Sequence, residues 1–385
     1  MKIGINLLYL LPGVVGGTET YAAGLLQGLA EIDRQNEYVV FMNRESEHWP
    51  LPQGEHFRRV VCPVHAASRA ARYLFEQLRL PRLLGRHRID VVHSLGYVGP
   101  LIAPCPAVVT LHDLNFMALS HPMPAARRAA LRFFAVQCAR RAERVITISA
   151  FSRGEICRVL NLDPGKVTAI HLGALRTGAS PAAGAWPELT GRYGIREPYV
   201  VAFGGRTLNK NIPRLIRAFA LLRDAVPHSL VLVGHIPADV DLAAETAELR
   251  ERIIVTGYVP EGDVFPLLSR AELFVLPSLY EGFGLPALEA QQAGVAVACS
   301  TAGSLPEVAG EGAVYFDPES VEGMAAVMRR CLADAPLRSR LVRNGRENVA
   351  RFSWNRTAEE TAAVYREAFA GRRRGEHPAA VCDKA

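Results

Sequence analysis

The sequence predicts an α/β protein made of two facing, doubly wound, Rossmann-like domains with a cleft between them. Three observations lead to this fold class. The chain has 385 residues, enough for two domains of about 150 residues each. Short apolar runs alternate with helical patterns almost throughout, as in strand–helix units on a parallel sheet. A segment rich in Gly, Ala, Ser and Pro, residues 173–187, interrupts the alternation near the middle and indicates a linker.

The predicted elements follow one another in the same way in both halves. The first half has apolar runs at KIGINLLYL, YVVFMN, DVVHSLG, AVVTLHDL and RVITISA, with helices over 19–31 and 124–143. The second has runs at YVVAFGG, SLVLVGH, RIIVTGY, LFVLPS, VAVACS and VYFDP, with helices over 212–224, 241–250, 261–269 and 286–293. We therefore place one domain at 1–180, a second at 188–350 and a final helix at 354–370. The basic tail, 371–385, cannot bury apolar surface and is expected to be disordered.

Composition and charge narrow the class of protein. Hydrophobic residues make up 49% of the chain, which excludes global disorder, and 44 Lys and Arg against 38 Asp and Glu give a net charge of +6 that permits anionic partners. The seven cysteines form no C-x-x-C pair, so we expect no disulfide framework and a reducing, cytoplasmic environment. Pro12 and Glu19 indicate that the apolar N-terminus is a buried strand and not a signal peptide.

The stretch LFVLPSLYEGFGLPALEA carries the clearest chemical signal. A predicted strand ends there in EGFGL, residues 281–285, and a helix is expected to begin at Pro286. The two glycines let backbone N–H groups approach an anion, and the helix adds its positive end. Glu281 in the loop and Glu289, which we place in the first helical turn, can accept hydrogen bonds from sugar or ribose hydroxyls in one cleft. The alternative is that both glutamates only stabilise the helix N-terminus.

A second turn, AFGGRTLNKN, follows the predicted strand YVVAFGG. Gly204 and Gly205 open the turn, and Arg206 and Lys210 stand four residues apart within it. Arg can bind two phosphate oxygens at once and Lys supplies a compact charge, so the pair can neutralise a departing diphosphate. The alternative is a solvated charged turn.

Residues of the first half complete the candidate site. Gly16 and Gly17 form a turn after the first strand, and His112 follows the strand AVVTL. A strand-end histidine can bind a sugar hydroxyl in either protonation state, although a structural histidine is the alternative. No spacing of ligand residues indicates a metal site, and in the D-x-D of Asp239 and Asp241 the second carboxylate is explained as a helix N-cap.

These motifs, together with SAFSR at 149–153, TGYVP at 256–260 and SLPEVAG at 304–310, resemble retaining glycosyltransferases of family 4, which have the GT-B architecture. The resemblance runs from about residue 1 to 370 and is closest to the bacterial mannosyltransferase-like enzymes of O-antigen, lipopolysaccharide and exopolysaccharide synthesis. Family members often carry another basic residue immediately before the Lys-Asn pair, where this chain has Leu208-Asn209.

The resemblance implies a role for each candidate residue. Arg206 and Lys210 would hold the donor diphosphate, Glu281 would contact the donor sugar, Glu289 the ribose, and His112 the sugar near the reaction centre. Further donor-binding residues would be Gly16, Gly17, Gly205, Tyr258, Val259, Gly282, Phe283, Gly284 and Leu285.

The implied reaction is retaining transfer of a sugar from a nucleotide sugar to a glycan or lipid-linked acceptor, which binds on the side of the N-terminal domain. The resemblance favours GDP-mannose as donor, with no metal or other cofactor, and a phosphate oxygen would take the acceptor's proton. A UDP-sugar donor is the alternative. A GT-B epimerase or phosphorylase is disfavoured because the E-x7-E stretch supplies neither an acid/base pair nor a cofactor lysine.

A basic, partly apolar surface is predicted in the first domain. Eight arginines and only one acidic residue, Glu76, lie between Phe57 and Arg88, and six arginines lie between residues 127 and 144. Basic side chains mixed with exposed apolar ones suit an anionic membrane, so we expect peripheral binding at the inner face of the cytoplasmic membrane. The alternative is solvated arginines with leucines packed in the core. Nucleic acid is not expected as a partner because no motif for it occurs.

Overall fold

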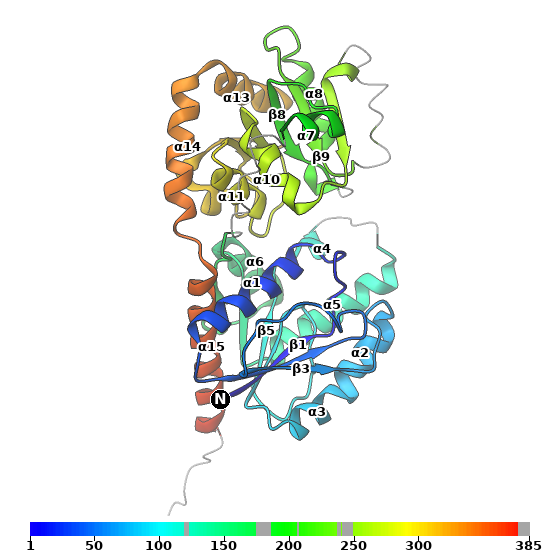
Figure 1. The fold of residues 1–385 in the computed structure, drawn as a ribbon. Helices are drawn as coiled ribbons and strands as arrows, with labels where there is room; N and C mark the ends of the chain where they lie inside the picture. The colour runs from blue at the N-terminus through cyan, green and yellow to red at the C-terminus, as the bar shows by residue number, and fades with distance from the viewer. Residues whose placement is uncertain (119–122, 175–185, 206–207, 237–239, 241–248, 376–385) are drawn as a thin grey trace, which may run out of the picture. The chain divides into compact units, whose positions relative to one another are not determined.

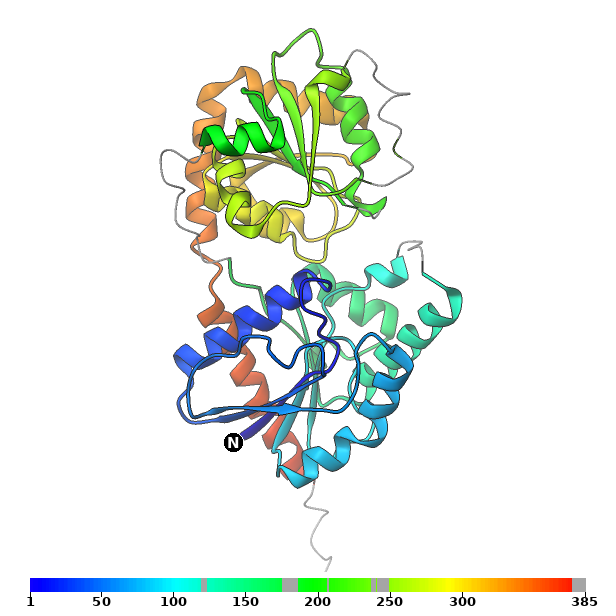
Figure 2. The same cartoon turned by 45° about the vertical axis from the view of Figure 1, so that its right-hand side comes forward.

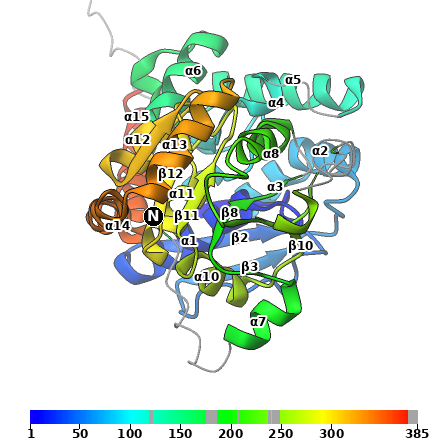
Figure 3. The same ribbon diagram turned by 90° about the horizontal axis from the view of Figure 1, so that it is seen from above.

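The computed structural model describes residues 1–118, 123–174, 186–205, 208–236, 240 and 249–375. The chain divides into two compact units: unit 1 comprises Met1–Gly173 with Ser353–Ala385, and unit 2 comprises Ala174–Phe352. Figures 1, 2 and 3 show the ribbon from three directions. Each unit is a parallel sheet with helices packed on it, so the predicted class of two Rossmann-like, doubly wound units is confirmed.

Unit 1 is built on a sheet that has seven strands among the described residues, in the order β3-β2-β1-β4-β5-β6-β7, and every pair is parallel. The strands are β1 (Lys2–Leu7), β2 (Glu37–Met42), β3 (Phe57–Val61), β4 (Val91–Ser94), β5 (Ala107–Thr110), β6 (Arg144–Thr147) and β7 (Val167–Ala169). Most are short apolar runs because a parallel sheet is covered on both faces. The edge strand β3 is the exception, since it exposes Arg58 and Arg59.

The helices of unit 1 are α1 (Gly17–Ile32), α2 (Arg69–Leu78), α3 (Leu80–Arg86), α4 (Asn115–Ala118), α5 (Ala125–Arg141), α6 (Ala150–Leu160), the 3₁₀ turn η1 (Pro164–Lys166) and α15 (Trp354–Gly375). Although α1 and α15 are far apart in sequence, they pack side by side (Figure 1). Gly24 and Gly28 of α1 make room for Trp354, the first residue of α15. The SAFSR motif begins α6: the side chain of Ser149 accepts a hydrogen bond from the Ser152 N–H and caps the helix.

Unit 2 has six described strands in the order β10-β9-β8-β11-β12-β13, again all parallel. They are β8 (Tyr199–Phe203), β9 (Ser229–Val233), β10 (Ile253–Gly257), β11 (Leu273–Leu276), β12 (Ala296–Ser300) and β13 (Ala313–Phe316). The chain winds outward from β8 in one direction and from β11 in the other. The strand order therefore reverses between β8 and β11, where doubly wound sheets bind their ligands.

The described helical elements of unit 2 are α7 (Trp186–Tyr193), η2 (Leu208–Lys210), α8 (Ile212–Ala220), η3 (Arg250–Arg252), α10 (Glu261–Ser269), α11 (Leu285–Ala293), α12 (Leu305–Ala309), η4 (Gly310–Gly312), α13 (Val321–Ala333) and α14 (Ala335–Val349). One apolar core lies under α8 and α13, and another lies under α10 and α11. The two cores contain different side chains of the same strands, as expected of a sheet covered on both faces.

The last helix continues to Gly375, beyond the predicted end at residue 370, because Ala and Arg are good helix formers and no proline intervenes. Part of the expected tail is thus helical, and residues 376–385 lie outside the described residues. Most of the expected helix 241–250 also lies outside the described residues. The same is true of Asp239 and Asp241.

Candidate functional site

The two charged motifs of unit 2 follow adjacent strands at the point where the strand order reverses. The turn with Lys210 follows β8, and the loop with Glu281 follows β11, which pairs with β8. A backbone hydrogen bond of 2.7 Å from the Leu279 N–H to the Asn209 carbonyl joins the two loops. The side chain of Asn211 also donates to the Pro277 carbonyl at 3.0 Å. The sheet topology and these contacts therefore hold both motifs together.

Lys210 and Glu281 form an ion pair. Lys210 Nζ lies 2.9 Å from Glu281 Oε1, and the side chains are 22% and 13% exposed. A Cβ atom at position 205 would lie 2.7 Å from Lys210 Cγ, so Gly205 leaves the space through which the lysine side chain passes. Arg206, the predicted partner of Lys210, lies outside the described residues.

Glu281 is held by one of its two carboxylate oxygens. Oε1 accepts hydrogen bonds from Lys210 and, at 2.7 Å, from the Ser278 hydroxyl. Oε2 makes no hydrogen bond within the part of the chain that the structure describes. The carboxylate is thus fixed through one oxygen and has the other available to a ligand hydroxyl.

Ser304, to which the sequence alone assigns no individual role, holds the loop that carries Glu281 through hydrogen bonds. The Ser304 hydroxyl lies 3.0 Å from the Glu281 carbonyl and 2.8 Å from the Phe283 carbonyl, and the Ser304 N–H donates to the Glu281 carbonyl at 3.1 Å. Gly303 adopts a φ of 64°, and a Cβ there would overlap the Glu281 carbonyl. The SLPEVAG motif that marked the family resemblance is therefore also a structural support for the Glu281 loop.

The Gly282–Leu285 segment leads into the N-terminus of α11. The helix begins at Leu285, one residue before the predicted Pro286, and Gly284 precedes it with a φ of 98° that favours glycine. Helix N-termini carry a partial positive charge, and this one begins four residues after Glu281.

Glu289 lies in the second turn of α11 and not in the predicted first turn, because the helix starts at Leu285. Its side chain makes no hydrogen bond within the described residues. Burial, together with the nearby Glu261 carboxylate, raises the pKa of the Glu289 carboxyl to about 7, although Lys210 partly opposes the rise. A carboxyl in this position gains little from the helix end, so stabilisation of the N-terminus does not explain it.

Two predicted donor-binding residues differ in exposure. Tyr258 is 77% exposed and can reach a ligand, whereas Val259 is 8% exposed and packs in the core beneath α10. The assignment of Val259 to donor binding therefore stays a prediction, and its side chain is largely buried because an apolar residue just after β10 closes the core.

In unit 1, Gly16 directly precedes α1 and Gly17 is its first residue, in the connection that follows β1. Gly16 has a φ of 57°, and a Cβ at either position would meet no atom within 4 Å, so the backbone here is open to a close ligand. Glu19 ties the preceding loop in place: one of its oxygens accepts from the Gly13 N–H at 2.8 Å and the other from Trp49 Nε1 at 2.9 Å. Glu19, the glutamate of the GGTE motif, thus holds the loop that precedes α1.

His112 lies just beyond β5 and is 5% exposed. Its Nε2 lies 2.9 Å from the Leu95 carbonyl, so Nε2 carries the hydrogen and Nδ1 presents a lone pair. Burial lowers the pKa of His112 to about 4. The expectation that this residue serves in either protonation state is therefore wrong: it is neutral near pH 7, since the Leu95 bond offsets only part of the cost of burying a charge.

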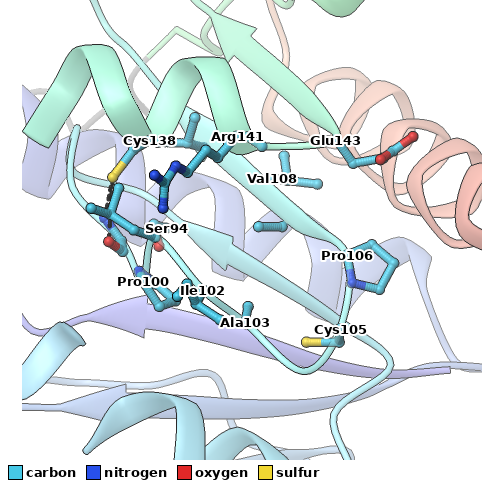
Figure 4. A pocket seen from close by; sticks show the side chains of 15 residues that line it. Ser94, Pro100, Ile102, Ala103, Cys105, Pro106, Val108, Cys138, Arg141 and Glu143 are labelled. Atoms are coloured by element: carbon cyan, nitrogen blue, oxygen red, sulfur yellow. Dashed lines mark hydrogen bonds between the residues drawn. The ribbon is translucent and has the colours of Figure 1, made fainter. Parts of the chain in front are cut away.

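A cavity of about 340 Å³ lies in unit 1 beside the loop between β4 and β5 (Figure 4). Ser94, Ile102, Cys105, Cys138 and Arg141 are among its lining residues. The Cys138 thiol is held by the Gly99 backbone at 3.3 Å, and Arg141 projects from the end of α5 (Figure 4). None of the predicted site residues lines this cavity.

No group of three or more His, Cys, Asp or Glu residues among the described positions is arranged to hold a metal ion. No described helix is both long and apolar enough to cross a membrane.

A doubly wound unit with a cation–carboxylate pair and a helix N-terminus at its switch point, joined in one chain to a second Rossmann-like unit, is typical of the GT-B class of glycosyltransferases. Comparisons with known proteins agree with this class. The family described as "Glycosyl transferases group 1" matches residues 190–348, and the family described as "Glycosyltransferase Family 4" matches residues 15–174.

Individual relatives extend the comparison. The chain is 30% identical over 266 residues to the O-antigen chain mannosyltransferase B of Escherichia coli, covering 68% of this chain and 70% of that protein. It is 29% identical over 405 residues to the D-inositol 3-phosphate glycosyltransferase of Salinispora arenicola (strain CNS-205), covering 93% and 88%. The crystal structure of Anabaena HepE with UDP and glucose matches with a TM-score of 0.70 at 19% identity, covering 94% and 99%. The chain therefore belongs to the family 4 glycosyltransferases and is an enzyme.

Proposed function

We propose that the protein transfers mannose from GDP-mannose to a glycan or lipid-linked acceptor with retention of anomeric configuration. The observation that carries the proposal is the Lys210–Glu281 pair at the switch point of unit 2, where a nucleotide diphosphate and its sugar meet a cation and a carboxylate. The mannosyl choice is supported by the relationship to an O-antigen chain mannosyltransferase.

The residues have complementary tasks in this reaction. Lys210 has two ammonium hydrogens left for phosphate oxygens, and Arg206 is expected to assist. Glu281 Oε2 accepts a hydroxyl of the donor sugar, and Glu289 accepts the ribose hydroxyls. The bond from the anomeric carbon to the diphosphate breaks, the acceptor oxygen forms the new bond on the same face, and its proton goes to a phosphate oxygen. Lys210 and the end of α11 stabilise the negative charge that develops on the diphosphate, so no metal is required.

His112 contributes a neutral acceptor. Because Nε2 is committed to Leu95, Nδ1 is the atom that can receive a hydrogen bond from a donor-sugar hydroxyl. A ring that stays neutral also avoids placing a positive charge next to the oxocarbenium character that develops on the sugar.

A UDP-sugar is the second candidate donor, since a structural neighbour of the same fold was crystallised with UDP and glucose. Incubation of the purified chain with GDP-mannose or UDP-glucose, each with EDTA and with Mg²⁺, tests the donor and the metal together. Slow release of mannose from GDP-mannose in EDTA, lost in Lys210→Ala, is the expected result. Hydrolysis of UDP-glucose but not of GDP-mannose would identify a UDP-sugar as the donor. Activity only in the presence of Mg²⁺ would overturn the metal-free mechanism.

We further propose that helices α2 and α5 of unit 1 bind an anionic membrane surface that carries the acceptor. The two helices meet through Tyr73 and Phe134, whose ring centroids are 4.8 Å apart. Leu74, Leu78 and Phe133 are 60%, 54% and 55% exposed beside exposed arginines. Exposed leucines favour the membrane interpretation over a packed core.

One arginine does not belong to this surface. Arg72 is buried, with its Nε 3.8 Å from Glu76 Oε2. The exposed arginines of α2, α3 and α5 are Arg69, Arg82, Arg86, Arg127, Arg132, Arg140 and Arg141, with Arg79 between α2 and α3.

Vesicle binding tests the membrane proposal. Replacing Arg79, Arg82 and Arg86 with Ser should abolish sedimentation with vesicles of anionic phospholipid, whereas replacing the exposed Arg340, Arg343 and Arg346 of α14 removes the same charge elsewhere and should not. Equal loss in both triple variants, or no binding by the parent protein, contradicts the proposed surface.

A further inference from the structure

A chain of buried hydrogen bonds runs through the core of unit 1 from α15 to α1. Tyr365 Oη lies 2.7 Å from His93 Nδ1, and His93 Nε2 lies 2.7 Å from Thr110 Oγ1. Thr110 Oγ1 lies 3.1 Å from Tyr21 Oη. All four side chains are at most 1% exposed. Four separate elements, α15, β4, β5 and α1, are thus joined by polar groups inside an otherwise apolar core.

The chain of bonds has little freedom. Burial, assisted by the nearby His112, lowers the pKa of His93 to about 3, so the ring is neutral. A neutral imidazole has one donor nitrogen and one acceptor nitrogen. The Tyr365 and Thr110 hydroxyls must therefore point in one consistent direction for both bonds to form, and breaking one bond leaves a buried polar atom unsatisfied.

The far end of this chain meets His112 in two ways. Thr110, whose hydroxyl hydrogen-bonds to both His93 and Tyr21, is the last residue of β5 and lies two positions before His112. The Tyr21 ring packs edge-on against the His112 ring, with centroids 4.9 Å apart and an interplanar angle of 88°. With Nε2 held by Leu95, the backbone, the ring face and the tautomer of His112 are all fixed.

We propose that Tyr365 and His93 are positioning residues that aim the Nδ1 lone pair of His112 at the donor sugar. The inference rests on the proposed function of His112. Neither residue touches substrate; each acts through Thr110 and Tyr21. Helix α15 therefore has a part in the reaction beyond completing the fold of unit 1, since small displacements of a substrate-binding atom are costly in rate.

Tyr365→Phe tests the proposal because it removes one hydroxyl and keeps the ring. We expect kcat of transfer to fall about tenfold with the donor KM changed less than twofold. Tyr199→Phe is the matched control: Tyr199 is 0% exposed and its hydroxyl makes a 2.7 Å bond to the Leu267 carbonyl in unit 2. It should leave kcat within twofold. Thr110→Val, which keeps the shape of Thr110, breaks the chain at its centre and should repeat the effect of Tyr365→Phe.

A double-substitution cycle separates positioning from general damage. If Tyr365 acts through His112, adding Tyr365→Phe to His112→Ala produces no further loss of kcat. An equal further loss in the His112→Ala background overturns the proposal, as does unchanged kcat in both Tyr365→Phe and Thr110→Val.

The ¹⁵N spectrum of the His112 ring distinguishes failure of the positioning role of Tyr365 and His93 from failure of the proposed function. His112, assigned by the signal lost in His112→Ala, should show an unprotonated Nδ1 that shifts in Tyr365→Phe and not in Tyr199→Phe. An unshifted signal refutes the positioning role even if the protein transfers mannose. A shifted signal with full transfer in His112→Ala instead refutes the role of His112 in transfer.

Discussion

Lys210 Nζ lies 2.9 Å from Glu281 Oε1, so the cation and the carboxylate that we assign to the donor are paired with each other. Both side chains are mostly hidden from solvent, and Ser278 adds a third member at 2.7 Å. The pair holds each group where a ligand needs it, because a lone lysine or glutamate would adopt many rotamers.

Loss of either member of this pair should remove transfer and leave the fold intact. We expect Lys210→Ala to lower kcat/KM at least about a hundredfold, since an electrostatic contact to the leaving group is lost, and Glu281→Ala to lose transfer as well. Steady-state kinetics and circular dichroism measure the two effects. Arg192→Ala, which removes surface ion pairs with Glu188 and Asp263 in the same unit, should change kcat/KM less than twofold. Full activity of either site variant contradicts the assigned site.

Ser304 should matter for donor affinity although it need not contact the donor. Its hydroxyl lies within hydrogen-bond distance of the Glu281 and Phe283 carbonyls, so Ser304→Ala loosens the loop, with only the Ser304 N–H bond to the Glu281 carbonyl retained. We expect the donor Kd to rise about tenfold, measured by calorimetry. Ser269→Ala removes a serine hydroxyl bonded to the Pro266 carbonyl in α10 and should leave the Kd unchanged. Equal effects of the two substitutions would show that the Ser304 hydroxyl is not needed to hold the Glu281 loop for donor binding.

Glu289 gives the donor affinity a defined pH dependence. The folded pKa of about 7 lies above the ordinary value of 4.5, so the carboxyl is about one-tenth ionised at pH 6. If the ionised form accepts the ribose hydroxyls, donor binding weakens up to about tenfold between pH 8 and pH 6. Glu289→Gln should bind more weakly at pH 8 and lose most of this dependence. Parallel pH profiles for the parent and the Gln variant would exclude Glu289 as the group responsible.

The same group affects stability with a definite sign. Because its pKa is raised on folding, its contribution to stability is complete below about pH 4.5 and is lost as the pH rises through about 7. Glu289→Gln should therefore raise the thermal midpoint relative to the parent at pH 8 and alter it little at pH 4.5. Measuring the difference between the two proteins at each pH removes the effect of the other titrating groups.

Periodicity and loop chemistry predicted the fold class because parallel strands are continuous apolar runs that end in glycine- or histidine-bearing turns. Lys210 and Glu281 could be placed near each other since both directly follow such runs. The roles of Ser304 and Glu19 in holding loops are not predictable from sequence, because Ser304 binds carbonyls more than 20 residues away, Glu19 binds the Gly13 N–H and the Trp49 side chain, and a lone Ser or Glu gives no pattern. The low pKa of His112 is not predictable from sequence for a related reason, since spacing does not report that the Leu95 carbonyl and Tyr21 enclose the ring.

The packing of α1 on α15 allows no added atom at two glycines. A Cβ at Gly24 would overlap the Trp354 ring, and one at Gly28 would overlap the Trp354 carbonyl, which is backbone and cannot move aside. We expect Gly28→Ala to destabilise unit 1 by about 1–3 kcal/mol, as overpacking does, despite the better helix propensity of Ala. Gly154→Ala in the middle of α6 meets no atom within 4 Å and should stabilise the same unit by about 0.5–1 kcal/mol. Thermal unfolding of both variants measures the contrast, and a stable Gly28→Ala protein would show that α15 does not dock on α1 as closely as described.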